Sequence, residues 1–292
     1  MVELKGGLGN QMFQYSIGRA LSLNFSTDLY LDTSFLTKNS VSSLELTARN
    51  YELDVFTIKA NLASADLVNS FKNDSLVNKF LRKLGLPSKN TLTEPSLAHH
   101  KAVDRSRPPL YLVGYWQSER YFFEFEDKIR EDFTFSSPLD SLSKVISSTI
   151  TRDDKSIGIH FRRGDFISST LANKFHGVCS INYYNEAIQI LDETVDNANY
   201  YVFSDQPEWV QENFVMGRPR MTLVSHNSGD DSWKDMYLMS LCKHNIIANS
   251  TFSWWAAWLN KNPEKIIIAP KKWFADTSKI SPDLIPAKWI QL

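Results

Sequence analysis

Short apolar runs alternate with segments of helical periodicity along most of the chain. In residues 155–292 this alternation repeats about five times, which predicts a parallel, doubly wound sheet with helices on its faces. The strands expected in this half are 156–161, 200–203, 221–224, 245–248 and 265–269.

The N-terminal half shows the same alternation less regularly. Strands are expected at 2–5, 27–32 and 110–116, with a further candidate at 49–56, helical stretches within 61–84 and 117–131, and a polar loop over 87–109. The charged stretch 151–155 separates the halves and predicts a domain boundary. We therefore expect two α/β domains, 1–152 and 153–292, that face each other across a cleft.

The strand expected at 156–161 ends in Arg162, Arg163, Gly164 and Asp165. Ligands of α/β sheets bind at the carboxyl ends of strands, and guanidinium groups match phosphate oxygens with two parallel hydrogen bonds. One arginine is expected to grip a diphosphate while the fold holds the other, with Asp165 orienting one of the pair. The alternative is an exposed Arg–Asp turn without a ligand.

A glycine loop connects the first expected strand to a helix, over residues 6–11. Glycines allow a ligand to approach the backbone closely, and a helix start offers free N–H groups. The dinucleotide pattern G-x-G-x-x-G fails because Met12 stands where the third glycine belongs. Asn10 and Gln11 are therefore expected to present amides from a cleft wall; a tight turn capped by Asn10 is the alternative.

Further polar residues follow the other strands of the C-terminal half. They are Asp205, Asn249, Ser250, Thr251 and Ser253. A long loop over 167–180, which contains His176, follows the arginine pair. Polar side chains gathered at one sheet edge are what a nucleotide pocket requires, and long loops after ligand strands are often functional.

The composition argues against several classes of protein. Hydrophobic residues make up 42% and charged residues 22% of the chain, and the net charge of −1 without long basic runs argues against nucleic-acid binding. No apolar run approaches the roughly 20 residues of a membrane span, and the chain starts without a signal-peptide pattern. Cys179 and Cys242 are expected to be reduced thiols, so a cytoplasmic enzyme is expected, one that meets any membrane-linked substrate at the cytoplasmic face.

The chain contains no D-x-D motif, which many sugar-nucleotide enzymes use to hold a divalent metal, and no paired Cys or His-x-x-x-His pattern for zinc. We therefore expect cationic side chains and helix N-termini, without a metal, to neutralise a leaving diphosphate.

Four stretches together carry a family resemblance. They read G-G-L-G-N-Q-M-F-Q-Y over 6–15, H-F-R-R-G-D over 160–165, F-S-D over 203–205 and N-S-T-F-S-W-W over 249–255. This combination resembles the bacterial α-1,2-fucosyltransferases, family 11 of the glycosyltransferases, from residue 3 to about 275. The resemblance implies a GT-B fold and inverting, metal-independent transfer of L-fucose from GDP-β-L-fucose to the 2-hydroxyl of a terminal galactose.

For the nucleotide, the resemblance implies roles for residues of the second half. Arg162 matches the arginine on the β-phosphate, His160 and Asp205 match residues near the nucleotide, and Asp235 resembles an aspartate that pairs with guanine. In the last motif the hydroxyls and the helix start face the diphosphate. The remaining residues expected to bind the nucleotide are Arg163 of the second stretch and Asn249, Ser250, Thr251 and Ser253 of the last one.

For the reacting sugar, Asn10 matches a cleft asparagine close to where the glycosidic oxygen forms. Because an amide is no base at neutral pH, Asn10 would only position the hydroxyl. Asp165 and His176 are the candidates for the remaining catalytic roles, and neither is singled out as general base. Trp254 and Trp255 are expected in the core.

Several readings remain open. The acceptor is free lactose, a Lewis-type or blood-group precursor, or a lipid-linked repeat unit of a surface polysaccharide, which would bring the enzyme to the inner membrane face. A related glycosyltransferase with another nucleotide-sugar or linkage is the alternative enzyme, and a sugar-binding protein without catalysis is the reading from another class.

Overall fold

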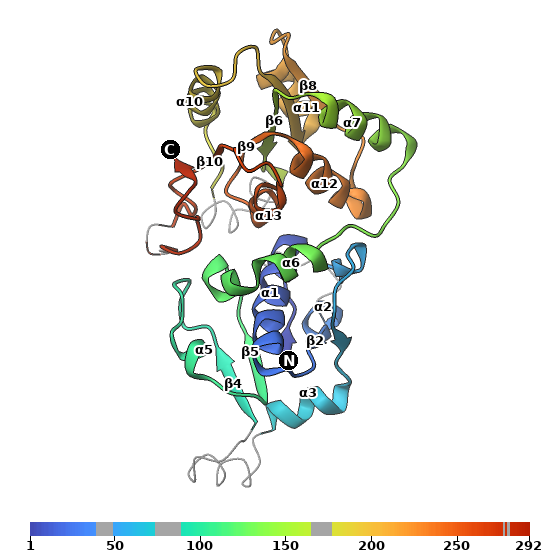
Figure 1. The fold of residues 1–292 in the computed structure, drawn as a ribbon, viewed down its shortest axis with the longest axis vertical. Coiled ribbons are helices and arrows are strands. Elements are labelled where there is room, and N and C mark those ends of the chain that lie inside the picture. Colours follow the sequence, from blue (N-terminus) through green and yellow to red (C-terminus); the bar gives the residue numbers. More distant parts are fainter. Residues whose placement is uncertain (39–48, 74–88, 165–176, 277, 279–280) are drawn as a thin grey trace. The chain divides into compact units, whose positions relative to one another are not determined.

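The computed structural model describes residues 1–38, 49–73, 89–164, 177–276, 278 and 281–292. The chain forms two compact units, each a sheet with helices on it (Figure 1). Unit 1 consists of Met1–Ser136 and Ile280–Leu284; unit 2 consists of Ser137–Lys279 and Ile285–Leu292. Both are α/β units with parallel sheets, as the strand–helix alternation predicts.

Unit 1 has a parallel sheet of strand order β3-β2-β1-β5-β4. Its strands are β1 (Val2–Glu3), β2 (Tyr30–Asp32), β3 (Asn61–Leu62), β4 (Asn90–Thr93) and β5 (Leu110–Val113). Its helices are α1 (Leu8–Phe25), α2 (Ser34–Lys38), α3 (Ala65–Lys72), α5 (Ala102–Arg105) and α6 (Glu126–Asp132). The chain leaves β1 toward β2 and β3 on one side and returns as β4 and β5 on the other, so the order reverses between β1 and β5.

Two expectations for unit 1 were wrong. Residues 49–56 contain the 3₁₀ turn Leu53–Val55 and one antiparallel bridge from Phe56 to Phe135 instead of a strand. Strand β4 lies inside the segment expected to be a loop, because it is short and its burial alternates between half-buried and exposed positions.

Unit 2 has a parallel sheet of strand order β11-β10-β9-β6-β7-β8. Its strands are β6 (Ser156–Phe161), β7 (Asn199–Ser204), β8 (Met221–Val224), β9 (His244–Ile246), β10 (Ile267–Ala269) and β11 (Ile290–Gln291). Its helices are α7 (Ser141–Arg152), α10 (Ile181–Asp192), α11 (Pro207–Val210), α12 (Trp233–Leu241) and α13 (Thr251–Leu259). This is the strand order typical of dinucleotide-binding sheets, with the reversal between β6 and β9.

The core of unit 2 lies on both faces of β6, whose six residues are all buried. Phe161 stacks on Tyr184 of α10, with ring centroids 3.8 Å apart. On α13, Trp254 and Trp255 are fully buried and meet edge to face, which confirms their expected place in the core. Burial of both strand faces explains why β6 reads as an apolar run.

The compact units divide after Ser136, whereas the sequence places the boundary after residue 152. The difference is helix α7, which belongs to unit 2. Its first turn contacts the rest of that unit, because Asp140, its N-cap, forms an ion pair with Lys234 of α12. The charged stretch at 151–155 is thus the turn from α7 into β6.

Candidate active site

The carboxyl edge of the unit 2 sheet is a topological switch point. Strands β6 and β9 are neighbours there, and the strands that follow them in sequence, β7 and β10, lie on opposite sides of this pair. Open α/β sheets bind ligands in the crevice at this point. The residues that follow β6 and β9 are therefore the candidate site of this unit.

Asp205 organises the segment that follows β6. Phe161 lies opposite Ser204 in the β6–β7 register, so the next residues of both strands emerge side by side. The Asp205 carboxylate accepts hydrogen bonds from the backbone N–H groups of Arg163 and Gly164, both at 2.9 Å, and forms an ion pair with Arg162 at 2.9 Å. Asp205 therefore fixes the conformation of the loop after β6 and the position of the Arg162 guanidinium.

Asp165 was the residue expected to orient an arginine, and it lies outside the described residues, as does His176. Within the described part of the chain, Asp205 has this role for Arg162. The sequence placed Asp205 near the nucleotide but did not predict its bond to Arg162, since the two residues lie far apart along the chain.

The two arginines have different environments. The Arg163 guanidinium lies over the ring of Trp209 in α11, with 3.2 Å between Cζ and the ring centroid. The Arg162 guanidinium lies beside Asp205 and its side chain keeps 22% exposure. The fold therefore holds Arg163 against an aromatic ring and Arg162 against a carboxylate, and the expected contact of one arginine with a diphosphate stays a prediction. The contact of Trp209 with Arg163 was not predicted. The one feature of the sequence that could have indicated it is that Trp209 lies in the helix that follows β7 and Asp205.

His160 is a neutral side chain at this site. It is 5% exposed, and burial, followed by the charge of Arg162, lowers its pKa to about 3. Its ring lies 5.5 Å from that of Phe252, and Nδ1 has no hydrogen-bond partner among the described residues. A buried nitrogen without a partner costs on the order of 1–3 kcal/mol, and a ligand or an ordered water is the usual partner of such a group.

The segment after β9 leads directly into α13. Ser250 is the N-cap and Thr251 the first helical residue, both are half-buried, and the first turn carries no acidic residue. The N–H groups of such a helix start carry partial positive charge and favour an anion. Ser250 and Thr251 therefore remain candidates for contact with a phosphate.

Asn249 and Ser253 have structural bonds instead. The Asn249 amide donates to the carbonyls of Trp273 at 3.1 Å and Gly177 at 3.3 Å. The buried Ser253 hydroxyl bonds to the carbonyl of Ala248 at 3.3 Å. Both side chains shape the turn from β9 into α13, which differs from their expected contact with the nucleotide.

Asp235 lies on α12 and is 7% exposed. Its carboxylate accepts a hydrogen bond of 2.7 Å from the Asn227 amide, and burial raises its pKa to about 7. Asn227 in turn bonds to Ser143, which also contacts His226 at 2.9 Å. These three residues after β8 and on α7 were not predicted, because nothing in their spacing marks them.

In unit 1 the corresponding switch point lies between β1 and β5. Gln117, which follows β5, donates a 2.8 Å hydrogen bond to the Asn10 side-chain oxygen on α1. Gly6 has φ +75°, and a Cβ there would lie 2.5 Å from the Asn10 amide nitrogen, so a glycine is required. The buried Gln11 amide bonds instead to the backbone of Gly6 and Asn50, so its expected exposure in a cleft was wrong.

The sequence analysis missed one carboxylate at this edge of the unit 1 sheet. Glu94 follows β4 and accepts hydrogen bonds from the backbone N–H groups of Tyr115 at 2.7 Å and Trp116 at 3.0 Å. Trp116 has φ +56°, an uncommon conformation for a bulky residue. Burial raises the pKa of Glu94, against the lowering effect of these two bonds and of Lys5.

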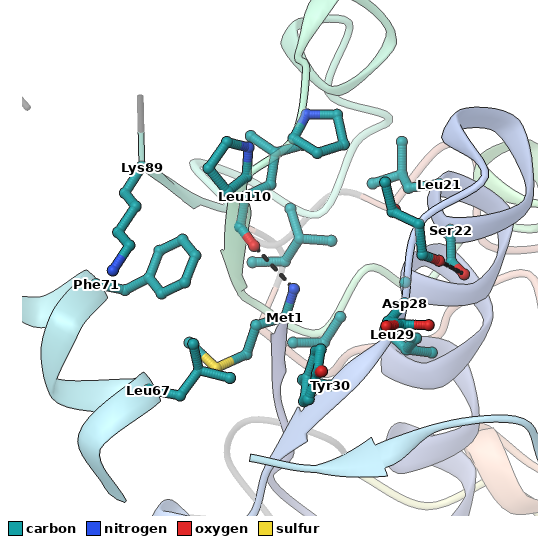
Figure 2. Close-up of a pocket in the computed structure, with 16 residues that line it drawn as sticks. Met1, Leu21, Ser22, Asp28, Leu29, Tyr30, Leu67, Phe71, Lys89 and Leu110 are labelled. Atoms are coloured by element: carbon teal, nitrogen blue, oxygen red, sulfur yellow. Dashed lines mark hydrogen bonds between the residues drawn. The ribbon is translucent and has the colours of Figure 1, made fainter. Parts of the chain in front are cut away.

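Unit 1 also contains an apolar cavity of about 280 Å³. Figure 2 shows Leu67 and Phe71 of α3 on one side and Leu21 of α1 on the other, with the Met1 amine bonded to the Leu110 carbonyl. These residues lie at the amino edge of the sheet. Because substrates of parallel sheets bind at the opposite edge, we do not assign this cavity to the substrate.

Among the described residues, no three His, Cys, Asp or Glu side chains are grouped so that they could hold a metal ion. No helix in the described part of the chain is long and apolar enough to cross a membrane.

Known proteins resemble the chain over its whole length. The family model for glycosyl transferase family 11 matches residues 1–292. An alpha-1,2-colitosyltransferase of Escherichia coli is 36% identical, covering 100% of this chain and 98% of that protein. The O-antigen biosynthesis glycosyltransferase WbnK of Escherichia coli is 32% identical, covering 99% of both chains.

A more distant relative is the human galactoside alpha-(1,2)-fucosyltransferase 1. It is 27% identical over 164 residues, which cover 54% of this chain and 45% of the human protein. The family match over the entire chain agrees with the resemblance carried by the four motifs. The chain belongs to glycosyltransferase family 11.

Proposed function

We propose that this glycosyltransferase moves L-fucose from GDP-β-L-fucose to the 2-hydroxyl of a terminal galactose and forms an α-1,2 linkage with inversion. The observation that carries the proposal is Arg162, held by Asp205 at the switch point where α13 begins. The α-1,2 linkage in the names of two relatives supports the regiochemistry.

The chemistry follows from the charge that develops. As the bond from fucose to the β-phosphate breaks, negative charge grows on the phosphate oxygen and the sugar becomes oxocarbenium-like. Arg162 and the N–H groups at the start of α13 would stabilise that oxygen. A hydrogen bond to a charged group contributes roughly 1.5–3 kcal/mol, so two or three such bonds change the rate by orders of magnitude.

We propose that these groups replace a divalent metal, which is supported by the absence of a D-x-D motif from the sequence. In the same unit, Asp235 is proposed to accept hydrogen bonds from guanine. Its burial and its bond to Asn227 support this role, since a carboxylate held in an apolar surrounding discriminates strongly between donors and acceptors.

We propose that unit 2 binds the donor and unit 1 binds the acceptor, with Asn10 positioning the acceptor hydroxyl. We propose a galactose-terminated glycan or polysaccharide precursor as acceptor, and action at the cytoplasmic face of the membrane. The relative named for O-antigen biosynthesis supports a polysaccharide substrate.

A second donor is favoured by one observation. The relative with 36% identity is named a colitosyltransferase, and colitose is the 3-deoxy counterpart of L-fucose. Both sugars would leave the same GDP, so the contacts of Arg162 and Asp235 do not distinguish them. Discrimination would depend on whether a protein group bonds to the 3-hydroxyl of fucose.

The test is a transfer assay with purified protein, excess EDTA and a panel of β-galactosides. GDP-fucose and GDP-colitose are supplied separately and then in competition, and products are identified by mass and NMR. An α-1,2-fucosylated galactoside is expected, with GDP-fucose preferred. Preference for GDP-colitose would replace the donor and keep the linkage; transfer that stops with EDTA would contradict metal independence.

A further inference from the structure

The carboxyl edge of the unit 1 sheet carries side chains whose roles the donor chemistry does not explain. We name this set the unit 1 edge; its members are Lys5, Asn10, Glu94, Tyr115 and Gln117. Lys5 and Asn10 follow β1, Tyr115 and Gln117 follow β5, and Glu94 follows β4. Since β1 and β5 flank the switch point of this sheet, the set lies where an α/β unit binds a ligand.

Tyr115 provides an exposed aromatic surface at this edge. Tyr115 is 37% exposed, and among the described aromatic residues of unit 1 only Phe123 is also exposed. The Lys5 ammonium lies 4.7 Å from the centroid of the Tyr115 ring. A flat aromatic surface beside a few polar groups is typical of small-molecule sites.

The loop that carries Tyr115 is held in one conformation. Glu94 accepts from the N–H groups of Tyr115 and Trp116, and Trp116 has φ +56°. A Cβ at Gly114 would overlap the side chain of Glu94, so the loop and this carboxylate fit closely. Uncommon backbone conformations persist where the surroundings over-determine them, and they concentrate at binding sites.

Two amides complete the edge. Gln117 donates to the Asn10 side-chain oxygen at 2.8 Å, which orients the Asn10 amide group. In this orientation Asn10 keeps its NH₂ group, and Gln117 keeps its side-chain oxygen, for further hydrogen bonds. An aromatic face beside oriented amides provides the kinds of groups that bind a neutral sugar ring.

We propose that the unit 1 edge is the subsite for the acceptor galactoside. The ring of Tyr115 packs against the sugar, the Asn10–Gln117 pair binds its hydroxyls, and Glu94 positions the loop. Galactose suits an aromatic surface because its axial 4-hydroxyl leaves the C–H groups at carbons 3, 4 and 5 on one face. This inference rests on the proposed function only for the identity of the sugar as an acceptor.

The test measures binding without transfer. Protein saturated with GDP is mixed with methyl β-D-galactopyranoside, and saturation-transfer NMR reports the affinity. Tyr115→Ala is expected to weaken galactoside binding at least tenfold and to leave GDP affinity unchanged, while Tyr115→Phe keeps the ring and binds as the wild type does. Phe25→Ala, an aromatic truncation at the far end of α1, is the matched control.

Glu94→Gln tests the positioning role. One of the two bonds to the loop is lost, so galactoside affinity should fall by several fold with little change in thermal midpoint or GDP affinity. Wild-type affinity in Tyr115→Ala, or no galactoside binding to the wild type, would overturn the subsite. Galactoside binding through Tyr115 without fucose transfer would instead overturn the proposed function and leave the subsite standing.

Discussion

One carboxylate, that of Asp205, bonds to the Arg162 guanidinium and to the backbone N–H groups of the next two residues. The orientation of Arg162 is therefore coupled to the shape of its own loop. A change at any of these positions should alter how the arginine meets a phosphate.

Replacing Arg162 with alanine should abolish nearly all transfer while the protein still folds. The side chain lies at the edge of the sheet with 22% exposure, so its loss leaves the apolar core intact. Loss of one or more charged bonds to the leaving phosphate predicts a fall in kcat of at least 100-fold, from roughly 3 kcal/mol. Initial rates at saturating GDP-fucose measure it.

The control for Arg162→Ala is Arg220→Ala, which removes an arginine that pairs with Asp192 at the surface of unit 2. This variant should retain wild-type kcat, because exposed ion pairs contribute little. Near-normal turnover in folded Arg162→Ala would contradict the assignment of Arg162 to the phosphate.

Gly164→Ala should impair the donor site through sterics alone. The added Cβ would lie 2.6 Å from the Asp205 carboxylate oxygen, so the carboxylate or the loop must shift. We expect a rise in the Kd for GDP and a lower rate, in the same direction as in Asp205→Ala. Titration calorimetry with GDP measures the first effect.

Gly217→Ala separates site damage from backbone strain. Gly217 has φ +80° but open space around it, so alanine costs about 1 kcal/mol of folding stability without affecting Asp205. GDP affinity in this variant should match the wild type. Equal GDP affinity in Gly164→Ala would show that the loop tolerates the shift.

Asn10→Asp should lower transfer by at least tenfold with little change in stability. The new carboxylate can still accept the bond from Gln117 but has no N–H group to offer a substrate hydroxyl. Asn24→Asp, an exposed change on the same helix, is the control and should leave transfer unchanged. The measurement is kcat of both variants and of the wild type at saturating donor and acceptor; wild-type kcat in Asn10→Asp would contradict the role of Asn10.

The raised pKa of Asp235 predicts a pH-dependent stability difference. Its pKa of about 7 in the folded protein exceeds its ordinary value near 3.8, so the folded state holds a proton that the unfolded state releases. The wild type should therefore lose stability, on the order of a few kcal/mol, as pH rises from about 4 to 7. Asp235→Asn has no such proton and should escape this loss.

Urea unfolding at pH 4.5 and pH 8 without nucleotide measures the effect. The asparagine can still accept the bond from Asn227, so the comparison isolates the charge. The unfolding free energy of Asp235→Asn, relative to that of the wild type, should be higher at pH 8 than at pH 4.5. A variant less stable than the wild type at pH 8 would show that the carboxylate is stabilised when charged.

Tyr15→Phe should reduce stability without reducing transfer. The buried Tyr15 hydroxyl donates to Asp132 of α6 at 2.6 Å and accepts from the Lys59 backbone at 2.9 Å. Its removal takes the acceptor from the Lys59 N–H and one donor from the buried Asp132 carboxylate, which keeps its bond to Arg19; the cost is roughly 1–3 kcal/mol in unfolding free energy. Thermal unfolding measures the loss, and Tyr30→Phe on β2, with a half-buried side chain, is the control.

The sequence predicted those parts of the fold that rest on local patterns. Strand β6 was recognised because both faces are buried, and the arginines after it marked the site. Strands β3 and β4 carry no such pattern, since β3 has two exposed residues and β4 only alternate partly buried ones. Their pairing with neighbours, not their composition, makes them strands.

The sequence predicted which residues lie at the site better than it predicted the hydrogen bonds and ion pairs that they form. Asp205 was placed near the nucleotide, but its bond to Arg162 depends on the register of β6 and β7, which spacing does not reveal. The same holds for Glu94, which lies in a segment that reads as a polar loop. Asn249 and Ser253 belong to the motif, yet their side chains bond to backbone carbonyls.

Unit 1 is not one continuous stretch of chain, because residues 280–284 belong to it. Asp283 in this short segment forms an ion pair with Arg120 at 2.6 Å and caps the His99 N–H at 2.9 Å. Under the proposed assignment of the acceptor to unit 1, a chimera that exchanges acceptor preference between family members must carry two pieces, the first 136 residues and this C-terminal insertion. A single crossover after Ser136 would leave Arg120 facing a foreign residue in place of its own aspartate.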